Sequence, residues 1–127
     1  MERLWWDIRP EWLNPDLVLQ IDYINQEQGH VSIRGWAYLK DRDNFRYIRR
    51  LVFLNEEDKS FCVGTRSRYR GYLKEQFPEI EGMEMLGFTC DFSPDKMKGK
   101  NYRIGMMAES KDGKEIYMIF TDRILEL

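Results

Sequence analysis

The feature that most constrains this chain is a period-two alternation of apolar and polar side chains, which recurs from Leu17 almost to the C-terminus. Alternation of this kind marks β-strands that bury one face. Turn-like stretches separate the alternating segments, and the last of them contains Asp112-Gly113, the strongest short-range hairpin signal. Seven strands are expected, over residues 17–24, 31–37, 47–54, 60–65, 88–92, 102–109 and 116–120. We expect the last two to pair as an antiparallel hairpin.

About seven short strands at this spacing predict an all-β fold, an immunoglobulin-like sandwich of two sheets. An open barrel is the main alternative. One stretch breaks the alternation: Tyr69, Tyr72, Leu73 and Phe77 fall on one face of a helix. Pro78 then disfavours further helix. We therefore predict a single short helix at about residues 68–77.

The first 16 residues differ from the rest, and residues 17–127 have the length of a single domain. Trp5, Trp6 and Trp12 lie among charged residues, while Pro10 and Pro15 prevent a long helix. This lead-in segment either packs its tryptophans on the domain or docks them on a partner.

The inventory of reactive side chains argues against catalysis. The chain has one histidine, His30, and two cysteines, Cys62 and Cys90. It contains no phosphate-binding loop, dinucleotide fingerprint or nucleophile elbow. No catalytic residue, metal site or cofactor is therefore predicted. Apolar neighbours favour buried thiols for the two cysteines, with a disulfide as the alternative.

Paired carboxylates are the remaining route to an enzyme, since two of them can hydrolyse a glycoside. The candidates are Asp41 with Asp43, the run Glu56 to Asp58, and Glu79 with Glu81. All lie in polar, turn-like stretches, whereas a carboxyl that acts as a general acid needs an apolar pocket to raise its pKa. We expect a solvated surface, and a small hydrolase is the least favoured function.

Charge is distributed unevenly, although 20 basic and 22 acidic residues nearly cancel. Residues 40–74 contain ten basic and five acidic groups. Seven of the ten are arginines, whose planar guanidinium suits phosphate and carboxylate: Arg42, Arg46, Arg49, Arg50, Arg66, Arg68 and Arg70. They either pair within the fold, for example Arg70 with Glu79 and Glu81, or contact an anionic partner. Nucleic acid is not expected, because the chain is acidic, with a pI near 5.5.

Three short motifs follow one another along the chain. The first is Gly35-Trp36-Ala37, the second runs from Arg70 to Phe77-Pro78, and the third is Gly87-Phe88. Gly99 and Tyr102 follow. Gly35 can leave room for a bulky ring on one sheet face, and Gly87 and Gly99 suit turns that need positive φ.

This order of motifs resembles the small β-sandwich accessory domains attached to bacterial glycosyltransferases and related surface-polysaccharide enzymes. Gly71 and Tyr72 stand where that family's pattern has proline and aspartate. The resemblance implies a non-catalytic role beside a sugar-handling enzyme and supplies no catalytic residue.

The expected function is therefore that of an interaction module whose partner is a protein or a fused enzyme. The arginines and the aromatic residues Trp5, Trp6, Trp12 and Trp36 are the predicted contacts. One alternative is a carbohydrate-binding module that binds a glycan through Trp36 and neighbouring aromatic residues, and another is an anionic sugar phosphate bound by the arginines. A homodimer through an open sheet edge or through the tryptophan-bearing lead-in is also an alternative. No apolar run of membrane-spanning length and no secretory signal occurs, which predicts a cytoplasmic location.

Overall fold

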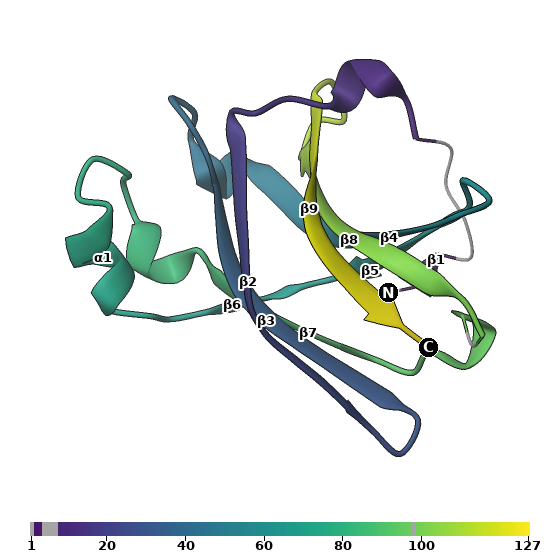
Figure 1. Ribbon diagram of the computed structural model, residues 1–127. Coiled ribbons are helices and arrows are strands. Elements are labelled where there is room, and N and C mark those ends of the chain that lie inside the picture. Colours follow the sequence, from purple (N-terminus) through teal and green to yellow (C-terminus); the bar gives the residue numbers. More distant parts are fainter. Residues whose placement is uncertain (1, 4–7, 98) are drawn as a thin grey trace.

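The computed structural model describes residues 2–3, 8–97 and 99–127, which form two antiparallel sheets that face each other (Figure 1). One sheet has the strand order β1 (Glu2–Arg3), β5 (Ser60–Gly64), β4 (Tyr47–Asn55), β8 (Asn101–Ser110), β9 (Ile116–Glu126). The other has the order β2 (Leu17–Glu27), β3 (His30–Leu39), β7 (Gly87–Phe92), β6 (Arg66–Arg68). The predicted two-sheet sandwich is confirmed, and neither sheet closes into a barrel.

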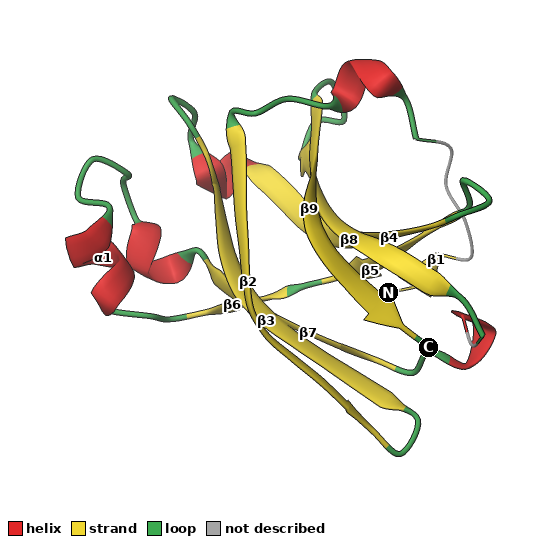
Figure 2. Ribbon diagram, in the orientation of Figure 1, coloured by secondary structure: helices red, strands yellow, loops and turns green. Residues whose placement is uncertain are grey.

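All seven predicted strands are present, and the two short strands β1 and β6 are additional. The β8–β9 hairpin is antiparallel as predicted, and Gly113 in its turn has φ +76°. Short 3₁₀ helices occupy several connections, as the coloured ribbon shows (Figure 2). They are η1 (Pro10–Trp12), η2 (Asn44–Arg46), η3 (Met83–Met85) and η4 (Asp95–Met97).

The helix is shorter than predicted. Helix α1 spans Tyr72–Gln76, because Arg66–Arg68 instead continue as β6 and pair with β7. The predicted helical face is also wrong in part: Leu73 is buried, but Tyr69 and Tyr72 are exposed. The apolar residues of this stretch have helical spacing in the sequence, but Tyr69 lies in the connection after strand β6, and only Tyr72 and Leu73 lie in the short helix.

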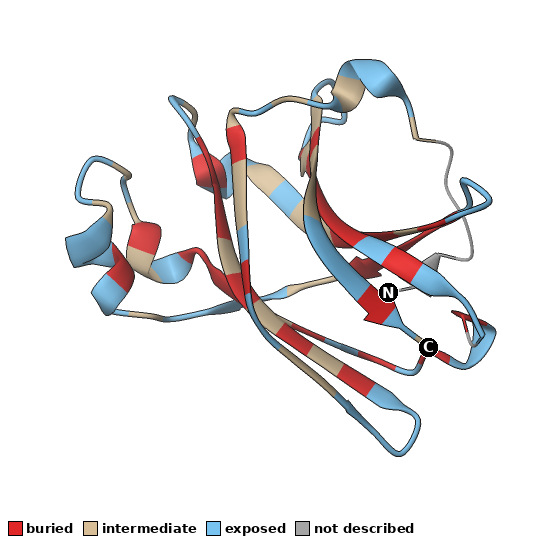
Figure 3. Cartoon of the chain, viewed as in Figure 1, coloured by how far each residue is buried: buried red, intermediate tan, exposed pale blue. Residues whose placement is uncertain are grey.

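The main core lies between the sheets and includes Ile33, Phe53, Phe88 and Ile104. Buried and partly exposed residues alternate along β3, which is the period-two pattern in space (Figure 3). Cys62 and Cys90 are buried thiols, as predicted, and no disulfide joins them.

Each sheet also carries a smaller cluster on its outer face. On the five-stranded sheet, Val52, Cys62, Met107 and Met118 are buried, with Ile8 and Trp12 of the lead-in packed against them. On the four-stranded sheet, Tyr38 is buried with Leu73, Met83 and Leu86. The last three come from residues 69–86, which we call the helical cover (Figure 1).

The first and third sequence motifs meet on neighbouring strands. In the β3–β7 register, Gly35 is opposite Phe88, and Trp36 is opposite Gly87. A Cβ atom added at Gly35 would lie 2.0 Å from the Gln20 carbonyl oxygen and 3.1 Å from the Phe88 ring, so Gly35 does leave room for a ring. At Gly87 a Cβ atom would lie 2.6 Å from the Arg68 carbonyl oxygen. The prediction of positive φ is confirmed for Gly99 but wrong for Gly87, which is needed for close packing.

Replacement of Gly35 by alanine should destabilise the sandwich by about 1–3 kcal/mol, because the new methyl group overlaps main-chain atoms of β2. Gly71→Ala is the matched control: its Cβ would meet the flexible end of Tyr69, and its φ of −58° suits alanine. Urea unfolding measures both variants. Equal stabilities would contradict the packing role assigned to Gly35.

Candidate functional site

Strand geometry separates arginines that are neighbours in the sequence. Arg49 and Arg50 are adjacent in β4, so their side chains lie on opposite faces of the sheet. Arg50 is on the outer face, where its Nη1 lies 2.9 Å from Oε1 of Glu109. Arg49 is on the inner face and bonds two carbonyl oxygens. The arginines of residues 40–74 therefore do not form one continuous surface.

Several arginines pair within the fold. Arg42 Nη1 lies 3.2 Å from Oδ2 of Asp16, and the Arg42 guanidinium lies 4.6 Å from the centre of the Tyr117 ring. Arg46 is exposed and forms a loose 3.5 Å ion pair with Asp43. Arg42, Arg46 and Arg50 therefore follow the first alternative, in which the arginines pair with carboxylates of the same fold.

Arg70 ties the helical cover to the sheet. Its Nη1 lies 2.5 Å from Oδ2 of Asp22 and donates to the Tyr72 hydroxyl. The expected pairing of Arg70 with Glu79 and Glu81 is therefore wrong. Asp22 is the extra residue of a bulge in β2, where the register shifts between Ile21 and Tyr23. Bulges re-aim side chains, and this one presents a carboxylate to Arg70.

The path of Arg70 explains the close packing at Gly87. A Cβ atom added to Gly87 would lie 3.2 Å from both Cγ and Cδ of Arg70, so the arginine stem crosses directly above this glycine. The Arg70 main-chain N–H also donates to the Glu84 carbonyl oxygen at 2.7 Å. Phe77, from the same cover, packs against Trp36 with ring centroids 4.8 Å apart. All three sequence motifs thus converge at one place on the four-stranded sheet.

The remaining predicted arginines, Arg66 and Arg68, lie on the outer face of this sheet. Ser67 between them is opposite Phe88, which faces the core, so the two arginines face away from it. Across the sheet, the register aligns Arg66, Thr89, Arg34 and Tyr23 in one row. Since neighbouring strands are about 4.8 Å apart, Arg66 and Arg34 are separated by roughly 10 Å.

We call Arg34, Arg66, Arg68, Tyr23 and Tyr72 the basic face. The Arg34 guanidinium lies 4.9 Å from the centre of the Tyr23 ring, and Tyr23 and Tyr72 are both exposed. No ion pair joins Arg34, Arg66 or Arg68 to another of the residues that the structure describes. Of the nearby carboxylates, Asp22 pairs with Arg70, and Asp91 accepts a hydrogen bond from the Ser32 hydroxyl and lies 3.7 Å from His30. This face combines three arginines that form no ion pair with a described residue and two exposed tyrosine rings.

Sequence reasoning missed Arg34, Tyr23 and Tyr72 as members of this surface. Arg34 lies outside the basic stretch of residues 40–74, so charge counting along the chain did not include it. Its place at an outward position of β3 was available from the alternation. The alternation does not reveal that β3 pairs with β7, which is what brings Arg34 near Arg66.

The predicted tryptophans have different environments. Trp36 is half-buried and stacks on Tyr38, with ring centroids 6.1 Å apart. Trp12 is half-buried against the outer face of the five-stranded sheet. Trp5 and Trp6 lie outside the described residues. The two described rings contribute to the protein's own packing, and the exposed rings near the arginines are tyrosines.

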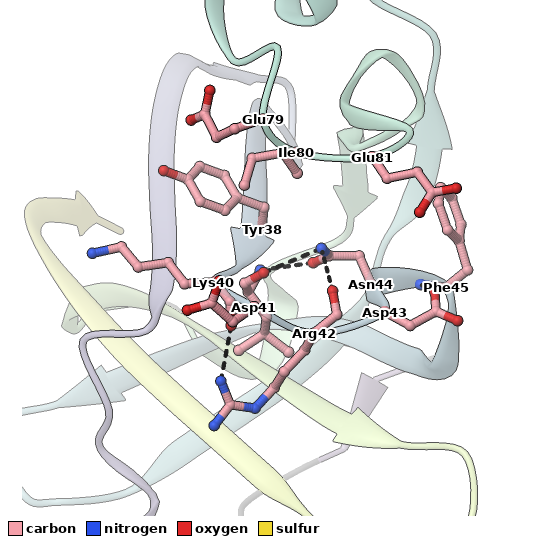
Figure 4. Close-up of a pocket in the computed structure, with 11 residues that line it drawn as sticks. Tyr38, Lys40, Asp41, Arg42, Asp43, Asn44, Phe45, Glu79, Ile80 and Glu81 are labelled. Atoms are coloured by element: carbon pink, nitrogen blue, oxygen red, sulfur yellow. Dashed lines mark hydrogen bonds between the residues drawn. The ribbon is translucent and has the colours of Figure 1, made fainter.

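A hollow of about 810 Å³ lies at one end of the sandwich, between the β3–β4 loop and residues 79–81 (Figure 4). Buried Asn44 shapes the loop: its side chain accepts the Leu39 N–H at 2.6 Å and donates to the carbonyl oxygens of Leu39 and Arg42.

Two of the predicted carboxylate pairs share this hollow. Asp41 and Asp43 lie on one wall and Glu79 and Glu81 on the other, and all four are exposed to solvent. The run Glu56 to Asp58 lies elsewhere, in the β4–β5 turn, where Lys100 bonds Glu57 and holds its pKa below the usual value. The described residues contain no group of three or more His, Cys, Asp or Glu that could hold a metal ion. The hollow lacks the apolar enclosure that acid catalysis by a carboxyl requires.

Comparison with known proteins adds no relative: no protein-family model, no curated protein and no solved structure matches the chain. The resemblance to glycosyltransferase accessory domains therefore stays a prediction. Within the described residues, no helix is long and apolar enough to cross a membrane.

The Arg70–Asp22 pair should stabilise the fold measurably, because the Arg70 and Asp22 side chains are only 13% and 32% exposed. A double-mutant cycle with Arg70→Met and Asp22→Asn should give a coupling energy of about 1 kcal/mol in urea unfolding. The methionine keeps an apolar stem above Gly87. The exposed pair Arg46–Asp43 is the control and should give less than about 0.5 kcal/mol. Similar coupling energies for both pairs would refute the role of Arg70 in tying the helical cover to the sheet.

Proposed function

We propose that the protein is a non-catalytic interaction module that docks an acidic surface of a partner protein on its basic face. The observation that carries this proposal is the contrast among the arginines. Arg42, Arg46, Arg50 and Arg70 pair with carboxylates of the fold, whereas Arg34, Arg66 and Arg68 share one sheet face without such partners among the described residues.

The composition of the basic face supports a protein partner. Arginine and tyrosine are enriched among the residues that dominate binding energy in protein interfaces. Tyr72 and Tyr23 are 51% and 41% exposed, and Tyr69, which follows Arg68 directly, is 66% exposed. The neighbouring edge strand, β6, has three residues of which two are arginines, and short charged edges disfavour strand addition. Contact through side chains is the mode that this surface favours.

The resemblance extends the proposal to the class of partner, a sugar-transfer enzyme of a surface-polysaccharide pathway. The motif residues themselves have structural roles here, since Gly35, Gly87 and Phe77 pack within the domain. The resemblance thus supports a shared scaffold, and the basic face is the part that would distinguish this chain's partner. Exposed carboxylates around the loop-end hollow support a non-catalytic role.

Charge reversal tests the docking surface. We expect Arg66→Glu with Arg68→Glu to weaken binding to the sugar-transfer enzyme encoded beside or fused to this protein by at least about tenfold, since like charges across an interface cost several kcal/mol. Lys59→Glu with Lys114→Glu makes the same charge change at exposed turns elsewhere and should leave affinity nearly unchanged. Isothermal titration calorimetry at two salt concentrations measures both.

Each part of the proposal can fail separately. Equal affinities for the two double variants would overturn the assignment of the basic face. A gene with no neighbouring or fused sugar-transfer enzyme would remove the proposed partner class. Saturable quenching of tryptophan fluorescence by neutral oligosaccharides, unchanged by charge reversal, would favour a carbohydrate-binding module instead.

A further inference from the structure

Arg49 has an environment unlike that of the other arginines. It projects from the inner face of β4, and its Nη1 donates to the carbonyl oxygens of Ala37 and Leu86, at 3.1 and 2.9 Å. No described carboxylate forms an ion pair with it. Burial lowers the pKa of Arg49 to about 10. The two carbonyl oxygens orient the guanidinium but carry no formal charge, so its positive charge stays uncompensated.

The remaining donors of Arg49 are accessible. Its Nε and Nη2 donate to no described residue, yet the described part of the chain has no buried side-chain nitrogen or oxygen without a hydrogen-bond partner. Solvent therefore reaches these donors. Arg49 is thus held along one side of its guanidinium, and its other donors remain available for a ligand.

Arg49 lines a hollow of about 250 Å³ between the start of β4, strand β6 and the β8–β9 hairpin. Ser67, Thr65 and Lys111 supply further polar groups, and Phe45 and Leu86 supply apolar ones. Lys111 is exposed, and the Ser67 hydroxyl has no hydrogen bond to another described residue. No carboxylate lines this hollow, in contrast to the loop-end hollow with its four. Its electrostatic character is therefore positive.

We propose that this hollow binds a single phosphate group, which accepts hydrogen bonds from Arg49, Ser67 and Lys111. Parallel N–H donors of a guanidinium match two phosphate oxygens, and such charge-assisted bonds are the strong ones. With a volume of about 250 Å³, the hollow has room for a phosphate group.

The phosphate site is distinct from the basic face. Side chains alternate along β6, so Ser67 faces the hollow while Arg66 and Arg68 face outward. The inference therefore does not require the proposed docking function. Phosphate could bind even if the basic face docks no partner, and a partner could dock even if the hollow binds no phosphate.

The test uses the full chain labelled with ¹⁵N and titrated with inorganic phosphate, with sodium chloride adjusted to constant ionic strength. We expect the Nε–H signal of Arg49 to shift and saturate. Arg49→Lys should abolish saturable binding, because lysine lacks the planar pair of donors. Ser67→Ala should weaken it about tenfold, the effect of losing one hydrogen bond to a charged group.

The control is Arg50→Lys, a neighbour that pairs with Glu109 on the opposite face and should leave phosphate affinity unchanged. Should Arg49→Lys fail to fold, Ser67→Ala and Lys111→Ala, both at exposed positions, decide the matter. A linear, unsaturated shift, or equal affinity in all variants, would overturn the site. Equally tight binding of acetate would show recognition of carboxylate as well and overturn selectivity for phosphate. A sugar phosphate that binds more tightly than inorganic phosphate would identify a larger ligand as the source of the group.

Discussion

The interlock between β3 and β7 is the contact on which the four-stranded sheet and its cover depend. Each strand contributes one glycine and one aromatic residue, and the register places glycine opposite aromatic on both faces. On the inner face Gly35 admits the Phe88 ring, and on the outer face Gly87 admits the stem of Arg70. Because successive residues face opposite sides of a strand, one two-residue pairing serves the core and the outer cluster together.

The helical cover depends on this interlock. Arg70 can cross the sheet to Asp22 because Gly87 has no side chain in its path, and Phe77 finds a packing surface on Trp36. The ion pair alone is a modest source of stability, whereas burial of Leu73, Met83 and Leu86 against the sheet adds a hydrophobic contribution. The pair fixes the position of that apolar surface on the sheet, and Arg70 also holds the Tyr72 hydroxyl, at 3.1 Å.

The sequence was sufficient for the seven longer strands and insufficient for β1, β6 and the site. Period-two alternation follows from backbone geometry, so it locates β3, β4 and β8 without knowledge of their neighbours. The error at residues 68–77 arose where a strand end and a turn imitate helical spacing. The basic face unites Arg34 with Arg66, and the bulge at Asp22 recruits Arg70. Strand order and register determine both contacts, and no local pattern encodes them.

A chain with a net charge near zero can still have local regions of positive charge. Asp16, Asp22 and Glu109, all outside residues 40–74, each neutralise one arginine of that basic stretch. Arg66 and Arg68, in the edge strand β6, have no such carboxylate partner among the described residues. Arg49 bonds two carbonyl oxygens, which carry no formal charge. The arginines of residues 40–74 that form no ion pair with a described carboxylate, Arg49, Arg66 and Arg68, therefore lie on the two sides of β6. Because salt at about 0.1 M screens exposed charges beyond roughly 10 Å, the local arrangement of arginines around β6, rather than the net charge, would govern the two proposed interactions with anionic groups.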